Sequence, residues 1–174
     1  MSSTEFKLRI SGVEPESIVD GPGFRYVVFT QGCPHGCPGC HNPQTHDFAG
    51  GEWADLGRIL AEIREDPLLS GVTLSGGEPF CQPEPLCTLA RAVREMGKTV
   101  MAYSGYTLEQ LLAMGEERPA VRELLELCDI LVDGPYIEAR RDLTLQYRGS
   151  ANQRVIHLRE ALGQSRGGSP APRA

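Results

Sequence analysis

Three cysteines within eight residues, Cys33, Cys37 and Cys40, are the residues of this chain best suited to do chemistry. The C-x3-C-x2-C spacing offers three thiolates to an iron–sulfur cluster, whereas a [4Fe–4S] cluster that only transfers electrons is normally held by four cysteines. One iron is then left for a ligand that is not protein. Four of the five spacer positions are proline or glycine, so we expect an irregular loop that wraps around the metal.

A structural zinc site is the alternative interpretation of the same cysteines. Together with one nearby histidine they would form a Cys3His set, which binds zinc tetrahedrally. The candidate histidines are His35, His41 and His46. Spacing constrains the identity of a metal only loosely, so the cysteines alone leave both options open. The zinc option implies an interaction module without catalysis.

Composition indicates one globular domain with a sizeable core, since 174 residues include 40% hydrophobic and 23% charged side chains. A formal net charge of −6 argues against a nucleic-acid-binding protein. The start lacks a charged segment followed by an apolar run, and no stretch has the length of a membrane span, so we expect no membrane contact and a cytoplasmic location. Six cysteines without a secretory signal then favour metal or redox chemistry over disulfides.

Short β-branched runs alternate with helical patterns along the chain. The expected strands are 25–30, 72–75, 99–103, 130–132 and 154–158. This alternation predicts an α/β fold with parallel strands. A full eight-fold barrel takes about 250 residues, so we expect a partial, open barrel of about five to six parallel strands. It would occupy residues 1–162, followed by a flexible Gly-, Ser- and Pro-rich tail at 163–174.

Polar segments follow several of the expected strands directly. They are the cysteine loop, Ser75–Glu78, Ser104–Gly105 and Asp133–Gly134. In parallel α/β folds, functional groups gather beyond the carboxyl ends of the strands. We therefore expect these segments to meet on one face.

The cysteine motif after one strand, followed by Gly76-Gly77-Glu78-Pro79 after the next, resembles the radical S-adenosylmethionine (SAM) superfamily. The resemblance implies a [4Fe–4S] cluster whose unique iron is chelated by the amino and carboxylate groups of SAM. Reductive cleavage of SAM then gives a 5′-deoxyadenosyl radical, so the cofactors supply the difficult chemistry. The second motif favours the cluster over zinc, because a zinc site leaves its placement unexplained.

A narrower resemblance covers most of the chain and is carried by six runs. They are Val19–Arg25, Phe29–His35, Cys40–Pro43, Tyr103–Tyr106, Asp133–Tyr136 and Tyr147–Arg154. Together they are similar to the activating enzymes of anaerobic ribonucleotide reductases. The resemblance implies a glycyl-radical activase, whose radical removes a hydrogen atom from one glycine of the large reductase subunit. Flavodoxin or ferredoxin is the expected reductant.

The resemblance also implies which residues bind the cofactors, and it requires no catalytic side chain. Cys33, Cys37 and Cys40 are the expected cluster ligands. Gly39 and His41 flank the last ligand, where an adenine would lie, although His41 could also be a surface histidine. Gly76, Gly77 and Glu78 are expected at the SAM amino group. Ribose and carboxylate contacts are expected from four further residues that could equally form turns or caps: Ser104, Asp133, Ser150 and Asn152.

Two other enzymatic interpretations stay open at this point. One is an activase of another glycyl-radical enzyme, of the pyruvate formate-lyase type. The other is a compact radical SAM enzyme that acts on a small molecule. The remaining cysteines receive no chemical role: Cys87 and Cys128 fall on apolar helical stripes and are expected to be buried, and Cys81 is interpreted as an incidental thiol.

Overall fold

The computed structural model describes residues 7–163, in which one seven-stranded sheet carries helices on one face. The spatial strand order is β3-β1-β2-β4-β5-β6-β7. The strands are β1 (Arg9–Ser17), β2 (Phe24–Thr30), β3 (Glu52–Trp53), β4 (Leu69–Gly76), β5 (Thr99–Tyr103), β6 (Ile130–Asp133) and β7 (Arg154–His157). Within residues 7–163 the edge strands β3 and β7 do not pair with each other, so the sheet is open. Most of the expected tail at 163–174 lies outside the described residues.

The helices follow the apolar stripes of the sequence. They are α1 (Leu56–Glu65), α2 (Pro83–Glu95), α3 (Leu108–Glu117), α4 (Pro119–Leu127) and α5 (Leu158–Ala161), with short 3-10 turns η1 (Pro43–Thr45), η2 (Pro79–Cys81) and η3 (Glu138–Arg140). In α2 the apolar stripe of Leu86, Leu89, Ala90 and Val93 is buried. These side chains join β-branched and leucine side chains of the sheet in one core. Burial of this stripe explains why the segment is helical.

The α/β class and the open, partial barrel are confirmed, but the number of parallel strands is four rather than five or six. The pairs β2–β4, β4–β5 and β5–β6 are parallel. Strand β7 is antiparallel to β6, because no α-helix crosses the sheet between them and the chain returns through the segment 134–153. Strand β7 also ends at His157, and Leu158 begins α5.

Two strands at the other edge were not predicted. Strand β1 pairs antiparallel with β2 and with the two-residue β3. Its sequence contains Gly12 and Pro15, and its register with β2 shifts at two places. A strand with such irregularities lacks the period-two pattern that reveals strands in a sequence.

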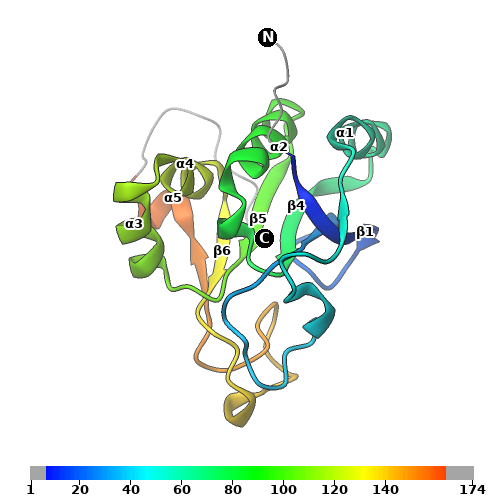
Figure 1. Ribbon diagram of the computed structural model, residues 1–174. Helices are drawn as coiled ribbons and strands as arrows, with labels where there is room; N and C mark the ends of the chain where they lie inside the picture. Colours follow the sequence, from blue (N-terminus) through cyan, green and yellow to red (C-terminus); the bar gives the residue numbers. More distant parts are fainter. Residues whose placement is uncertain (1–6, 164–174) are drawn as a thin grey trace.

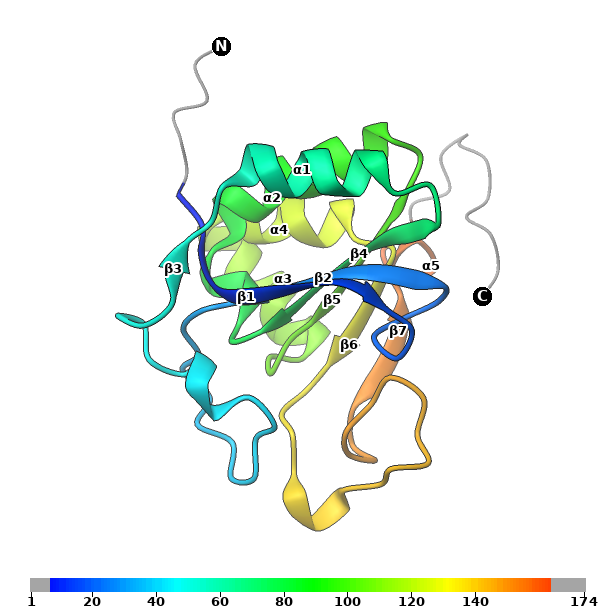
Figure 2. The same cartoon turned by 90° about the vertical axis from the view of Figure 1, so that its right-hand side faces the viewer.

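The layers leave one side of the molecule to loops. Figure 2 shows α1, α2 and α4 along one face of the sheet, while the cysteine loop and the segment between β6 and β7 extend below it. The same two segments lie together at the bottom of Figure 1. They follow the carboxyl ends of β2 and β6, which is the face predicted to collect functional groups. None of the helices described in residues 7–163 is long and apolar enough to cross a membrane.

A capping box forms the start of α3. The Thr107 hydroxyl accepts a hydrogen bond from the Gln110 N–H at 3.2 Å, and the Gln110 side chain accepts one from the Thr107 N–H at 2.9 Å. The pair satisfies two backbone donors that a helix start otherwise leaves unpaired. It fixes the point at which the chain leaves the turn after β5 and enters the helical layer.

We expect Thr107→Ala to lower the free energy of unfolding by about 1 kcal/mol, because the cap is lost. Thr88→Ala is the matched control, since Thr88 is exposed inside α2 and alanine is the better helix former there. Chemical denaturation of both variants without oxygen measures the difference. Equal losses of stability in the two variants would contradict the capping role.

Candidate functional site

A cavity of about 360 Å³ lies at the carboxyl ends of the four parallel strands. Its wall includes the three motif cysteines, the end of β4 and the turn after β5; the residues are Cys33, Cys37, Cys40, Ser75, Gly76, Gly77, Tyr103, Ser104 and Gly105. Segment 134–153 supplies the opposite side through Gly134, Tyr136, Tyr147, Arg148 and Gln153. The sequence prediction that these loops converge on one face is therefore confirmed.

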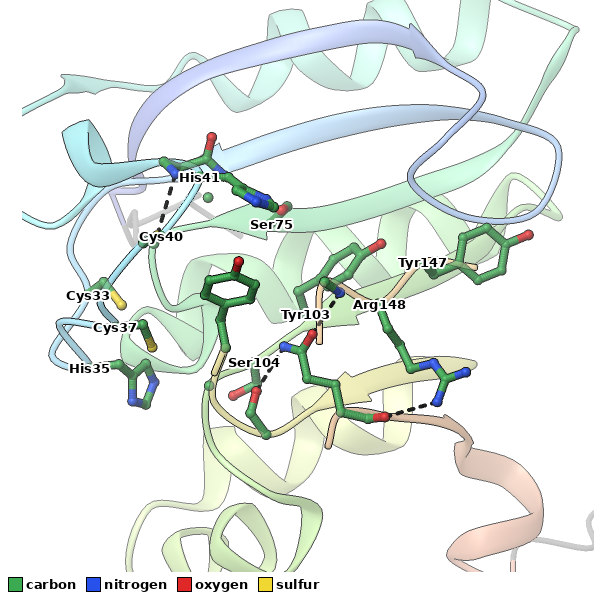
Figure 3. Close-up of a pocket in the computed structure, with 18 of the residues that line it drawn as sticks. Cys33, His35, Cys37, Cys40, His41, Ser75, Tyr103, Ser104, Tyr147 and Arg148 are labelled. Atoms are coloured by element: carbon green, nitrogen blue, oxygen red, sulfur yellow. Dashed lines mark hydrogen bonds between the residues drawn. The ribbon is translucent and has the colours of Figure 1, made fainter. Parts of the chain in front are cut away.

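The cysteine loop is irregular, as its prolines and glycines predict. Between Gln31 and Asn42 the structure has no helix or strand, and the loop is held by a few backbone hydrogen bonds. The N–H of Cys33 donates to the carbonyl of His46 at 3.2 Å, and that of Cys40 donates to the carbonyl of Cys37 at 3.2 Å. Figure 3 shows the sulfur atoms of Cys33 and Cys37 on one side of the cavity and Tyr147 and Arg148 on the other.

Gly76 and Gly77 border the cavity, but their missing side chains serve the packing of the chain. Gly76 has a φ of +89°, and an added Cβ would lie 2.6 Å from the backbone nitrogen of Thr30. An added Cβ on Gly77 would lie 2.4 Å from the carbonyl oxygen of Gly32. The end of β4 is thus pressed against the chain that leads into the cysteine loop. Only glycine permits this approach of two backbones.

Glu78 differs from its predicted role, because its carboxylate is fully buried and is occupied by the protein. Its Oε1 accepts hydrogen bonds from His35 Nε2 at 2.6 Å, Ser104 Oγ at 2.8 Å and the Gly105 N–H at 2.8 Å. Its Oε2 accepts from the Phe80 N–H at 3.1 Å. The side chain does not border the cavity. Glu78 therefore ties the cysteine loop to the ends of β4 and β5 instead of facing a ligand.

The other predicted cofactor residues divide into two groups. Cys40, His41 and Ser104 border the cavity. The centroids of the His41 and Tyr136 rings lie 5.2 Å apart. Two aromatic side chains from opposite loops therefore meet there. Ser104 accepts a hydrogen bond from the Tyr106 N–H at 3.0 Å while it donates to Glu78, and its hydroxyl is already engaged by the protein.

The second group does not border the cavity, so its predicted ligand contacts are not supported. Asp133 is buried, accepts from the Leu108 N–H at 2.7 Å and pairs with Arg154. Ser150 is buried and accepts from the Ile137 N–H at 3.2 Å. Asn152 donates to the Pro135 carbonyl at 2.7 Å. These residues form turns and caps, the alternative left open by the sequence.

Gly39 also lies outside the cavity wall, with a φ of +74°. A Cβ there would meet the carboxyl group of Glu138 at 2.7 Å. Gly39 therefore leaves room for the Glu138 side chain of η3 beside the cysteine loop. The Glu138 side chain lies against the Gly39 backbone.

Sequence reasoning missed several residues that line the cavity, most clearly Asp20, Tyr103, Tyr147 and Arg148. All four fall inside runs that carry the family resemblance, which was the available signal. Tyr147 has a φ of +65°, unusual for a residue other than glycine. Backbone strain of this kind is concentrated at functional sites. Burial raises the pKa of the Tyr103 phenol, which stays protonated at neutral pH.

The thiols fall into exposed and buried sets. Cys33, Cys37, Cys40 and Cys81 are partly exposed, and Cys87 and Cys128 are buried as predicted. Burial raises the pKa of Cys33, and the nearby carboxylate of Glu78 adds to the rise. A metal that binds this thiol must therefore displace its proton. Burial also raises the pKa of Cys81 and of Cys87 to about 11.

The donor set fits an iron–sulfur cluster. Within residues 7–163, no three His, Cys, Asp or Glu side chains are grouped so as to hold one metal ion. A single zinc ion needs its ligands at one point, whereas a cubane cluster binds its thiolates through separate irons. The three thiols therefore border a cavity that can contain the cluster between them.

Comparison with known proteins identifies the family. A family model described as a 4Fe-4S single cluster domain matches residues 19–156. The anaerobic ribonucleoside-triphosphate reductase-activating protein of Salmonella typhimurium is 36% identical over 155 residues, which cover 83% of this chain and 96% of that protein. The protein of the same name from Escherichia coli strain K12 is 33% identical over 161 residues, with the same coverage. The chain belongs to this family of activating proteins.

Family membership makes the chain an enzyme of the radical SAM type, with a [4Fe–4S] cluster and SAM as cofactors. The pyruvate formate-lyase-activating enzyme of Clostridium pasteurianum is 41% identical over 104 residues, which cover 56% of this chain and 44% of that enzyme. The crystal structure of QueE from Escherichia coli gives a TM-score of 0.46 at 20% identity, over 59% of this chain and 54% of that one.

We expect Glu78→Ala to lower the free energy of unfolding by more than about 2 kcal/mol, because four donors lose their buried acceptor. The variant is also expected to bind less iron after reconstitution, since the cysteine loop is released through His35. Glu84→Gln is the control, because Glu84 pairs with Arg118 at the surface. Denaturation curves and iron content measure the two effects. Normal iron content in Glu78→Ala would contradict the anchoring role.

Alkylation separates the two sets of thiols. In folded, iron-free protein at pH 8, we expect iodoacetamide to modify Cys37 and Cys40 quickly. We expect Cys87 to react roughly 100-fold more slowly than an ordinary exposed cysteine, because a thiol with a pKa of about 11 is rarely ionised. Cluster loading is expected to protect only the motif cysteines. Mass spectrometry of digested protein reports the positions, and fast labelling of Cys87 would contradict the described packing.

Proposed function

We propose that this protein activates an anaerobic ribonucleoside-triphosphate reductase by generating a radical on a glycine of the large reductase subunit. The proposal rests on how much of each relative the chain matches. The match extends over 96% of the length of the two reductase-activating relatives. The match to the pyruvate formate-lyase-activating enzyme extends over only 44% of that enzyme. Activation of a pyruvate formate-lyase is therefore the weaker candidate.

Cys33, Cys37 and Cys40 hold the cluster, and the site for SAM lies in the cavity beside them. When bound, the cluster and SAM supply the radical chemistry that removes the hydrogen atom. The backbone at Gly76 and Gly77 borders this space without side chains, so its polar atoms can accept hydrogen bonds from the SAM ammonium group. The buried Glu78 supports this edge from behind.

The ring pair of His41 and Tyr136 offers an aromatic surface for the adenine. Opposite the cysteines, Tyr103 and Tyr147 narrow the cavity and exclude water from the reacting centre. No side chain is needed as a general acid or base, because a hydrogen atom and not a proton is transferred. The residues of the cavity bind and orient the cofactors and shield the reacting centre from water.

The open side of the cavity suits a substrate that is part of another protein. Val19 and Leu143 border the cavity and are 71% and 78% exposed, so two apolar side chains lie at its rim. A glycine-bearing loop of the reductase enters between them. A flavodoxin or ferredoxin of the cytoplasm delivers the electron that starts the reaction.

The test is the formation of a glycyl radical on the reductase. Reconstituted protein, SAM, a reductant and the reductase are mixed without oxygen, and electron paramagnetic resonance is recorded. We expect a glycyl radical signal with the wild-type protein and none with Cys33→Ala, Cys37→Ala or Cys40→Ala, because each variant lacks one cluster ligand. Cys87→Ala is the control, since Cys87 is buried in the helical layer, and it is expected to keep the signal.

Two results would overturn the proposal. One is cleavage of SAM with a radical on pyruvate formate-lyase and none on the reductase. The other is full activity after all three motif cysteines are replaced. Loss of iron in the three cysteine variants, measured in the same samples, ties the missing signal to the cluster.

A further inference from the structure

The sulfur of Cys40 accepts a hydrogen bond to which the proposed function gives no role. The backbone N–H of Asn42 donates to this sulfur, with the nitrogen and the sulfur 3.5 Å apart. Figure 3 marks a hydrogen bond at Cys40 by a dashed line. Both residues border the cavity. The N–H group of Asn42 is therefore bonded to one of the three thiols that hold the cluster.

Asn42 is held in place by Thr45, the last residue of η1. The Asn42 carbonyl accepts hydrogen bonds from the Thr45 hydroxyl at 2.6 Å and from the Thr45 N–H at 3.0 Å. Thr45 is fully buried, and its own carbonyl accepts from the Gly32 N–H at 2.7 Å. Thr45 is thereby tied to the residue that precedes Cys33. Its hydroxyl fixes the residue whose N–H reaches the Cys40 sulfur.

A hydrogen bond to a ligating thiolate changes the energy of an iron–sulfur cluster, because the donor stabilises negative charge on the sulfur. Reduction makes the cluster more negative, so the reduced state gains more from the bond than the oxidised state. Hydrogen bonds to the sulfurs are accordingly one of the properties that set the reduction potential of a cluster. Residues that orient such donors act on the metal without touching it.

We propose that the Asn42 N–H stays bonded to the Cys40 thiolate when the cluster is present, and that the Thr45 hydroxyl positions this donor. The bond raises the reduction potential of the cluster, which makes the cluster easier to reduce by the electron donor. Asn42 contributes its backbone, whereas Thr45 contributes its side chain. This inference rests on the cluster of the proposed function, but it concerns the potential of the cluster and not the target of the radical.

The experiment is a redox titration of the reconstituted protein without SAM or reductase, followed by electron paramagnetic resonance of the reduced cluster. Thr45→Val keeps the shape of the side chain but has no hydroxyl, and Thr45→Ser keeps the hydroxyl. Thr30→Val is the matched control. Thr30 is also fully buried, its hydroxyl donates to the Ser75 carbonyl at 3.1 Å, and it does not border the cavity. Iron and sulfide content is measured in each sample.

We expect a shift of the midpoint potential to more negative values in Thr45→Val, a potential close to wild type in Thr45→Ser and no shift in Thr30→Val. Both valine variants lose a buried hydrogen bond, so the donor on Cys40 is what distinguishes them. An unchanged potential in fully loaded Thr45→Val, or an equal shift in Thr30→Val, would overturn the proposal. Because neither SAM nor the reductase is present, these outcomes leave the activase function untouched. Conversely, a failure to form the glycyl radical on the reductase would not affect this titration.

A second measurement covers the case in which the valine variant fails to bind the cluster. The chain has two asparagines, Asn42 and Asn152, and Asn152 does not border the cavity. Wild-type protein is labelled with asparagine that carries ¹⁵N at its backbone nitrogen, the cluster is reduced, and electron–nuclear double resonance is recorded. We expect a weak ¹⁵N coupling that unlabelled protein lacks. Absence of the coupling in a fully loaded sample would overturn the proposal.

Discussion

The buried carboxylate of Glu78 is the interaction on which the site depends. It accepts hydrogen bonds from the cysteine loop through His35, from the β5 turn through Ser104 and Gly105, and from the start of η2 through Phe80. The cysteine loop has no helix or strand of its own, so its shape must come from such contacts. A charged acceptor with four donors and no access to water is costly to separate from any of them. The motif that contains Glu78 therefore acts as a structural clamp.

This arrangement separates the stable part of the molecule from the reactive part. The parallel strands and their helical layer form the core, and the site consists of loops attached to the strand ends. A second clamp on the far side pairs Arg154 of β7 with Asp133 at the end of β6 and with Glu109 of α3. Asp133 precedes segment 134–153 and Arg154 follows it, so their ion pair joins the two ends of that segment. The cavity lies between these two loops.

The sequence predicted the α/β class, five of the seven strands and the helical patterns, because burial imposes a period that the residues display. It also predicted that the polar segments after the strands meet on one face, since the carboxyl ends of parallel strands lie at the same edge of a sheet. It did not predict β1, whose register shifts hide its pattern, or the direction of β7, which depends on a loop without a crossover helix. It misjudged the side chains of Glu78 and Asp133, because a carboxylate after a strand looks the same in a sequence whether it faces a ligand or a neighbouring loop. Only the burial of these side chains distinguishes the two roles.

The most direct test of the account is an anaerobic crystal structure of the protein loaded with its cluster and SAM, examined at Glu78. The clamp predicts that Oε1 of Glu78 stays within hydrogen-bond distance of His35 Nε2, close to the present 2.6 Å, while the SAM ammonium group is bound by backbone atoms at the cavity wall. A Glu78 carboxylate that has left His35 and contacts the ammonium group would contradict the account.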